Sequence, residues 1–202
     1  MTDALWYLGR GTGVSALVLF TLTMVLGLVL PSGRSLPGLP RFAVAALHRT
    51  ISLTALTLLV VHVTTLYLDP YAQLRLADVV VPFRGAYRPL WLGLGTLAGD
   101  LVVVLIATSL LRRHIGQRIW RMLHWAAYAC WPLALGHALG NGTDRAAGWM
   151  IWVAIGCAAA VAATLTWRVA QGQADKRAAE RRAARTVSAP PYFAGHGRGR
   201  RP

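Results

Sequence analysis

The chain has 202 residues, of which 55% are hydrophobic and only 14% are charged, and its formal net charge is +14. So small a charged fraction excludes an ordinary water-soluble domain. The apolar residues lie in long runs and do not alternate with polar ones, which excludes a transmembrane β-barrel. The composition therefore predicts an all-α, polytopic membrane protein.

We expect a bundle of five transmembrane helices, each of about 17 to 27 residues and so long enough to cross a hydrocarbon core of roughly 30 Å. In chain order these spans are Val14–Leu30, Phe42–Leu68, Leu90–Leu111, Ile119–Gly140 and Gly148–Val169. Residues 1–170 would form this membrane domain. Residues 171–202 would form a basic cytoplasmic tail that we expect to be disordered, with a basic helix lying on anionic lipid near residues 173–186 as the alternative.

The arginines orient the chain. Seven of them lie near the turns that follow the first and third spans, without acidic neighbours: Arg34, Arg41, Arg49, Arg112, Arg113, Arg118 and Arg121. On the opposite side the basic residues are diluted by Asp3, Asp69, Asp78 and Asp144. The positive-inside rule then predicts a cell-membrane protein with its N-terminus outside and its C-terminus in the cytoplasm. Because the positive excess lies on the inner side of the membrane, it is poor evidence for nucleic-acid binding.

Four of the six histidines form two pairs of matched spacing, His48 with His62 in the second span and His124 with His137 in the fourth. The separations of 14 and 13 residues correspond to roughly 20 Å along a helix, so each helix places one histidine near each membrane face. Both helices run in the same direction, which pairs His48 with His124 and His62 with His137. Two clamps of this kind suit two stacked haems. They do not suit zinc, which gathers its ligands around one ion.

The fourth span has one irregular feature. Thirteen residues on an ideal helix turn about 140° away from the starting face, so His124 and His137 do not share a face without a distortion. Pro132 lies between them and is the candidate for a kink that re-phases the helix.

These segments resemble the ferric reductase-like transmembrane superfamily. The residues that carry the resemblance are LHRTISLTALTLLVVHV (Leu47–Val63) and RRHIGQRIWRMLHWAAYACWPLALGH (Arg112–His137). That superfamily includes NADPH oxidase membrane domains, ferric reductases and the haem-bearing membrane subunit of bacterial methionine sulfoxide reductase systems. The resemblance covers roughly residues 6–170, and it implies two b-type haems whose iron ligands are His48, His62, His124 and His137. Many relatives have six spans, so a leading helix is missing here.

Relatives that take electrons from NADPH carry a flavin and nucleotide module after the last helix. Only 33 residues follow Val169 here, too few for such a fold. The GRGTG at Gly9–Gly13 follows no strand and is therefore not a dinucleotide fingerprint. We expect no flavin or NAD(P)H site in the chain. We expect instead a separate electron donor, a flavoprotein reductase or a quinol, and an acceptor on the outer side.

The sequence thus predicts a dihaem b-type membrane cytochrome, the electron-transfer component of an oxidoreductase, which takes electrons at the inner haem and releases them at the outer one. One alternative is a transporter or channel whose histidines relay protons or bind ions. Another is a cofactor-free structural subunit with hydrogen-bonded histidines. Transporter sites lie near the bilayer midplane, whereas these histidines lie toward the two faces.

Several other polar residues are candidates for supporting roles. Arg49 and Arg121 flank the inner histidines, where they would bind haem propionates or simply anchor the chain to the inner face. Arg84 and Arg88 would serve the outer haem or an anionic substrate. Asp100 lies inside a span, where it would accept a hydrogen bond from a ligating histidine or stay neutral beside span hydroxyls.

Overall fold

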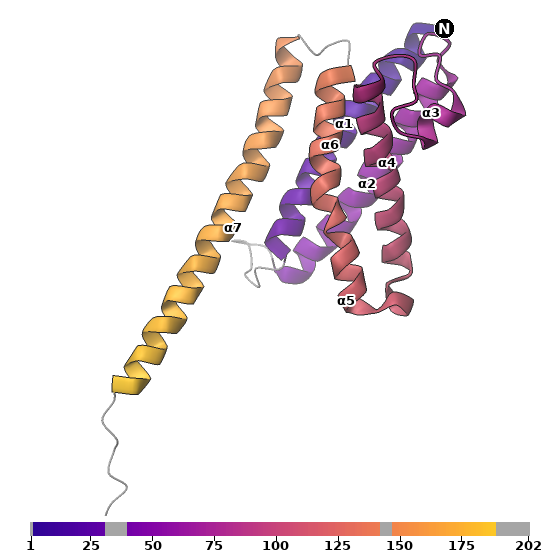
Figure 1. The fold of residues 1–202 in the computed structure, drawn as a ribbon. Helices are drawn as coiled ribbons and strands as arrows, with labels where there is room; N and C mark the ends of the chain where they lie inside the picture. The colour runs from indigo at the N-terminus through magenta and orange to yellow at the C-terminus, as the bar shows by residue number, and fades with distance from the viewer. Residues whose placement is uncertain (1, 31–39, 142–146, 189–202) are drawn as a thin grey trace, which may run out of the picture. The chain divides into compact units, whose positions relative to one another are not determined.

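The computed structural model describes residues 2–30, 40–141 and 147–188, and within these ranges it contains helices and turns but no strand. Its helices in chain order are α1 (Thr2–Val29), α2 (Arg41–Leu68), α3 (Leu76–Val80), α4 (Pro89–Leu110), α5 (Arg112–His124), α6 (Ala126–Asn141) and α7 (Gly148–Ser188) (Figure 1). The all-α fold class that the composition predicts is confirmed.

The bundle is built from two antiparallel helix pairs. α1 packs along α2 and α4 packs along α6, while a smaller contact between α1 and α6 joins the two pairs. The short α3 packs on α4, and α5 follows α4 at its other end, so α3 and α5 lie at opposite ends of the bundle (Figure 1). We call these the α3 end and the α5 end.

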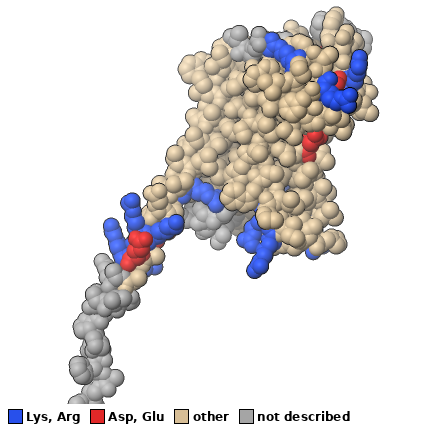
Figure 2. All heavy atoms as spheres, in the orientation of Figure 1, with Lys and Arg blue, Asp and Glu red and all other residues tan. Residues whose placement is uncertain are grey.

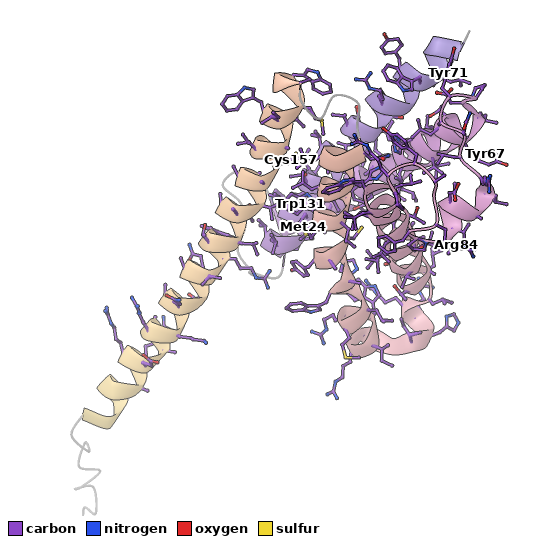
Figure 3. The ribbon with its side chains drawn as sticks, turned by 45° about the horizontal axis from the view of Figure 1, so that its top comes forward. Met24, Tyr67, Tyr71, Arg84, Trp131 and Cys157 are labelled. Carbon is purple, nitrogen blue, oxygen red and sulfur yellow. The ribbon has the colours of Figure 1, made fainter. Side chains whose placement is uncertain are left out.

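A small apolar core holds the two pairs together between these ends. Ala98, Val102 and Cys130 are buried at its centre. The partly buried side chains around them are Phe20, Leu56, Leu59, Leu101, Ile106, Leu133 and Ala134. The indole of Trp131 on α6 donates a hydrogen bond of 2.9 Å to the hydroxyl of Thr21 on α1, which fixes the two pairs laterally (Figure 3).

Large apolar side chains are exposed along the middle of the helices, among them Leu53 (58%), Val103 (66%) and Ile155 (50%). Four helical stretches are long and apolar enough to cross a membrane: Ala4–Val29, Phe42–Leu68, Pro89–Leu110 and Gly148–Ala183. Lipid covers such surface, and the helices satisfy their own backbone there. The chain is therefore a membrane protein with several apolar spans.

The prediction of five spans is not confirmed, because the fourth one, Ile119–Gly140, is divided at Trp125 into α5 and α6. α6 has 16 residues, fewer than the roughly 20 that cross the hydrocarbon core. α5 is strongly basic, and Gly116 interrupts it with φ 77° and ψ 158°. The apolar run begins only after the arginines of α5, so too little apolar length remains for a full span.

Two other boundaries differ from the sequence prediction. The first span begins at Ala4 and not at Val14, because the glycine-rich GRGTG segment stays helical within α1. We also expected a disordered tail from residue 171, whereas α7 continues to Ser188. Alanine, arginine, lysine, glutamine and glutamate dominate that stretch, and all of them favour a helix. Residues 189–202 of the expected tail lie outside the described residues.

The chain divides into two compact units, with Thr166 as the first residue of the second. The described part of that second unit is the C-terminal half of α7, which carries Lys176, Arg177, Arg181 and Arg182 beside Asp175 and Glu180. On the face of the first unit that Figure 2 shows, basic side chains lie at the two ends of the bundle. On this face, basic side chains are thus kept to the ends of the apolar spans.

Candidate functional site

The four span histidines meet in two pairs, one toward each end of the bundle. At the α3 end the ring centroids of His62 and His137 lie 6.4 Å apart, with the ring planes inclined by 83°. At the α5 end His48 lies near His124. The structure therefore brings together the same residues that the sequence pairs, first with first and second with second.

The two helices reach this arrangement in different ways. On α2 the interval of 14 residues is close to four turns, so His48 and His62 share one face. The other helix tightens just after His124: Trp125 N–H bonds to Met122 O at 3.2 Å, and Tyr128 N–H bonds to Trp125 O at 3.0 Å. Such 3₁₀-type bonds turn the chain about 20° more per residue than α-helical ones. They remove part of the mismatch that a 13-residue interval creates.

A distortion therefore lies at Trp125, at the junction between the basic α5 and the apolar α6 and seven residues before Pro132. Pro132 is inside α6, which continues past it to Asn141. Proline weakens a helix by removing one donor, but neighbouring helices can hold it in place in a membrane protein. That Pro132 also re-phases the helix stays a prediction.

Three of the four histidines donate Nδ1–H to a backbone carbonyl of a neighbouring helix. The bonds run from His48 to Thr23 (3.1 Å), from His62 to Gly9 (2.6 Å) and from His137 to Trp91 (2.9 Å). A carbonyl oxygen only accepts, so these imidazoles carry their proton on Nδ1 and keep a lone pair on Nε2. Nε2 is therefore the nitrogen that each ring offers to a metal, as in metal-binding histidines that are oriented by a hydrogen bond on the opposite side.

His124 is held differently. Its Nδ1 is buried and has no hydrogen-bond partner among the described residues. Its ring stacks on Trp120, one turn earlier in α5, with centroids 4.8 Å apart and planes inclined by 24°. The guanidinium carbon of Arg112 lies 5.2 Å from the centre of the Trp120 ring. Stacking fixes the plane of the His124 imidazole, but it does not select which ring nitrogen carries the proton.

The spacing at the α3 end fits one metal ion between two imidazoles. A metal–imidazole bond is about 2.0–2.1 Å long and the nitrogen lies roughly 1.1 Å from the ring centre, so two rings on opposite sides of one ion have centroids about 6.3 Å apart. The rings of His62 and His137 are 6.4 Å apart. No group of three or more metal-binding side chains occurs within the described ranges. A haem iron needs only two protein ligands, because the macrocycle supplies the other four.

The arginines near the α5-end pair are solvent-exposed. Arg49 follows His48 on α2, and Arg121 lies one turn before His124 on α5. Both guanidinium groups project from the surface of the bundle. They remain candidates for binding an anionic group beside the histidines.

Arg88 has a structural role. Its guanidinium donates a hydrogen bond of 2.6 Å to Gly140 O, three residues beyond His137, and so ties the start of α4 to the end of α6. Its backbone has φ 42° and ψ 62°, a left-handed conformation that costs free energy in a residue with a side chain. Arg84, in the same loop, is exposed (Figure 3). Arg88 therefore braces the α3-end pair.

Asp100 is half-buried on α4, and no hydrogen bond joins it to any of the four histidines in the part of the chain that the structure describes. Backbone carbonyls, not a carboxylate, serve the three anchored imidazoles. The expected role of Asp100 as their acceptor is therefore not seen.

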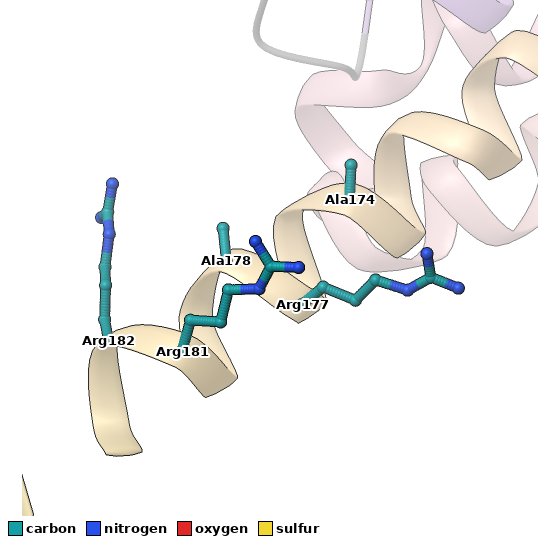
Figure 4. Close-up of a pocket in the computed structure, with 5 residues that line it drawn as sticks. All are labelled: Ala174, Arg177, Ala178, Arg181 and Arg182. Atoms are coloured by element: carbon teal, nitrogen blue, oxygen red, sulfur yellow. The ribbon is translucent and has the colours of Figure 1, made fainter. Parts of the chain in front are cut away.

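A hollow of about 380 Å³ lies on the C-terminal half of α7 (Figure 4). Its lining residues are Ala174, Arg177, Ala178, Arg181 and Arg182. All five come from a single helix, so the hollow lacks the opposing wall that encloses a small-molecule ligand.

Sequence reasoning singled out the four histidines but did not predict the groups to which three of them are hydrogen-bonded. A backbone carbonyl has no side-chain signature, so Gly9, Thr23 and Trp91 gave no direct signal. One indirect signal was present. Gly9 and Thr23 are separated by 14 residues, the same interval that separates His48 from His62 on the antiparallel helix α2.

The comparisons with known proteins identify one family. A family model described as "Ferric reductase like transmembrane component" matches residues 12–135. The match includes His48, His62 and His124 and stops two residues before His137. The comparison with curated proteins and the comparison with solved structures gave no significant match.

Proposed function

The chain belongs to the family of ferric reductase-like transmembrane components, and from that premise we propose that it is a dihaem b-type cytochrome which conducts electrons across the membrane. The family assignment supports a membrane electron-transfer component. The number of haems, their ligands and the direction of transfer are the finer parts of the proposal.

The observation that carries the proposal is the facing pair His62 and His137. Their 6.4 Å centroid distance suits one iron with an axial imidazole on each side. Both rings are anchored at Nδ1, which leaves both Nε2 atoms for the metal. A haem with two imidazole ligands has no open position for oxygen or substrate, and it passes single electrons.

His48 and His124 would hold the second haem at the α5 end. The interval of 14 residues along α2 places the two pairs roughly 21 Å apart along the helix. The residues of the chain would have three tasks in this proposal: they would present Nε2, orient three of the rings through their Nδ1–H bonds, and exclude water with the apolar core around Ala98 and Cys130.

The α5 end would face the cytoplasm. Arg112, Arg113, Arg118 and Arg121 are exposed on α5, as the positive-inside rule requires of the inner face. Electrons would enter at the haem of His48 and His124 and leave at that of His62 and His137. Membrane components of this family generally work with separate donor domains. The proposed donor is a flavoprotein reductase or a quinol, and the acceptor lies on the outer side.

The first experiment is a pyridine haemochrome assay on purified protein expressed with ample haem. We expect about two b-type haems per chain. A value near zero would exclude the proposal and favour the alternatives, a transporter or a cofactor-free structural subunit. A value near one would keep the α3-end site and remove the second haem.

The orientation is tested with single cysteines in intact cells. Both native cysteines, Cys130 and Cys157, are buried, so the background from an impermeant thiol reagent should be low. We expect Arg84→Cys to be labelled from outside and Arg118→Cys to be protected until the cells are permeabilised. The opposite pattern would exchange the inner and outer haems.

A further inference from the structure

Each of the three anchored imidazoles lies against a glycine on the helix that supplies its carbonyl. A Cβ atom added at Gly13 would lie 2.6 Å from Nδ1 of His62, and one added at Gly27 would lie 3.3 Å from Cε1 of His48. A Cβ atom at Gly95 would collide with Nδ1 of His137. A side chain at Gly13 or Gly95 would force the ring to shift, and one at Gly27 would press on the ring more mildly.

The glycines stand in a constant relation to the carbonyls. Each one is four residues after the carbonyl that accepts the histidine bond: Gly13 after Gly9, Gly27 after Thr23, and Gly95 after Trp91. In a helix the Cα–Cβ bond leans toward the N-terminus, so a side chain covers the turn before its own Cα. A side chain at the fourth position would therefore cover that carbonyl. Its oxygen has two lone pairs, of which the helix uses one.

We propose that Gly13, Gly27 and Gly95 are positioning residues for haem ligation, because each exposes a helical carbonyl that fixes a ligand histidine with its Nε2 toward the iron. The proposal rests on the proposed function. We call each carbonyl with its glycine a glycine seat: Gly9 with Gly13, Thr23 with Gly27, and Trp91 with Gly95.

Two features separate the seats from ordinary helix packing. The two seats on α1 are 14 residues apart, the same interval as His48 and His62, so α1 and α2 match along their length. Other glycines on the same helices do not meet a histidine: a Cβ atom at Gly11 or Gly99 would have nothing within 4 Å. Small residues as such therefore do not explain the contacts.

The fourth histidine supplies an internal contrast. Fourteen residues after Trp91 and Gly95, and so on the same face of α4, stand Leu105 and Ser109. The hydroxyl of Thr108 donates a hydrogen bond of 3.1 Å to Leu105 O, so that carbonyl already has a second donor. His124 is the histidine whose Nδ1 lacks a partner in the described structure. Where serine stands at the position of the glycine, the histidine is not anchored to a carbonyl.

The test compares single alanine substitutions in the full-length, haem-loaded protein. Gly13→Ala and Gly95→Ala should weaken haem binding at the α3 end by about 10- to 100-fold, the usual effect of losing a group that orients a metal ligand. The readouts are the haem-to-protein ratio and the low-spin ferric signals in electron paramagnetic resonance. We expect the ratio to fall from about two toward one, with the signal of the α5-end haem unchanged.

Three variants serve as controls. Gly11→Ala and Gly99→Ala meet open space and should keep both haems. Gly136→Ala is the packing control: its Cβ would lie 3.3 Å from Leu94 in the interface between α4 and α6, next to His137 but outside a seat. It should also keep both haems. Circular dichroism and size-exclusion chromatography show whether each variant is folded.

The outcomes separate this proposal from the proposed function. Two haems with unchanged signals in Gly13→Ala and Gly95→Ala would overturn the seats and leave the dihaem cytochrome intact. An equal loss of haem in Gly136→Ala would assign the effect to packing and also overturn them. If Gly13→Ala does not fold, Gly27→Ala decides, because its milder contact should perturb only the α5-end signal. A wild-type protein without haem would overturn both proposals.

Discussion

The two histidine pairs have the same composition but are held differently. At the α3 end both rings, His62 and His137, donate Nδ1–H to a carbonyl of a neighbouring helix. At the α5 end His48 has such a bond, whereas His124 stacks on Trp120 and its Nδ1 has no partner in the described structure. Two histidines in each pair therefore do not make the two pairs equal. The contacts of Nδ1 and of the ring face determine how firmly each imidazole is held.

The backbone around the two histidine pairs also differs, and it is more firmly held at the α3 end. The Arg88 brace to Gly140 closes the α3 end over a continuous part of α6. The α5 end is formed by a basic helix that Gly116 interrupts and that changes its hydrogen bonding at Trp125. Fewer tertiary bonds and a distorted backbone lower the cost of local opening. We therefore expect the α3-end site to be the more rigid of the two.

The largest effect should come from removing ligands. His62→Ala and His137→Ala should each abolish the same haem, and His48→Ala and His124→Ala the other, because each haem needs both of its axial ligands. Haem content should fall from about two to about one per chain, and the lost species is identified by its paramagnetic resonance signal. His114→Ala, on α5 but outside both pairs, should keep two haems. If His48→Ala and His137→Ala removed the same haem, the proposed pairing of the histidines would be wrong.

The next effect concerns the release of haem. Since one of its ligands lacks an anchor, the α5-end haem should dissociate about 10- to 100-fold faster than the α3-end haem. The measurement follows transfer of haem to excess apomyoglobin and should give two phases. In His62→Ala only the fast phase should remain, and in His48→Ala only the slow one. Equal rates would mean that the Trp120 stack holds His124 as well as a carbonyl would.

A smaller effect should follow from giving His124 a seat. The double substitution Thr108→Ala with Ser109→Gly removes the hydroxyl that bonds to Leu105 O and the side chain that follows this carbonyl by four residues, which leaves the carbonyl open to a second donor. A bond from Nδ1–H makes an imidazole a stronger electron donor and so favours ferric iron. The midpoint potential of the α5-end haem should fall, by about 59 mV if the preference for ferric iron rises tenfold. Thr108→Ala alone keeps the side chain of Ser109 and should leave the potential unchanged in the same redox titration.

The smallest effect should be electrostatic. Arg113→Gln and Arg118→Gln remove exposed charges at the α5 end, so reduction of the haems by an acidic flavoprotein reductase should slow by a few-fold at low salt. The effect should vanish near physiological ionic strength, where the Debye length is about 8 Å. Arg84→Gln, at the α3 end, is the matched control and should have no effect in stopped-flow measurements. If Arg84→Gln slowed the reduction equally, the donor would not dock specifically at the α5 end.

Part of this arrangement could be predicted from the sequence. Long apolar runs specify helices in a membrane whatever their neighbours are, so the fold class followed from composition. That His48 and His62 share one face could also be predicted, because 14 residues make about four regular helical turns. The relative orientation of His124 and His137 could not be predicted in this way, because it depends on how the helix packs against its neighbours. The tightened turn at Trp125 depends on how a basic and an apolar segment meet, and the visible Pro132 gave no sign of it.

The seats could not be predicted residue by residue. The GRGTG segment reads as a turn in a soluble protein, where glycine favours irregular backbone, but inside a span the helix is the only way to satisfy the peptide groups. The first candidate span therefore begins at Ala4, ten residues earlier than its apolar run suggests. The functional part of Gly9 is its carbonyl, and the functional part of Gly13 is the side chain that it lacks.

The two seats on α1 fix the number of residues that must separate Gly13 from Gly27. A glycine inside a helix costs about 1 kcal/mol relative to alanine, and α1 bears that cost at both Gly13 and Gly27. One inserted residue between them would rotate one seat by about 100° and shift it by about 1.5 Å, out of reach of its histidine. If another apolar helix replaced α1, it could still cross the membrane. To hold both histidines, however, it would need two exposed carbonyls and two glycines at the same spacing. Between Gly13 and Gly27, α1 should therefore tolerate substitutions far better than insertions or deletions.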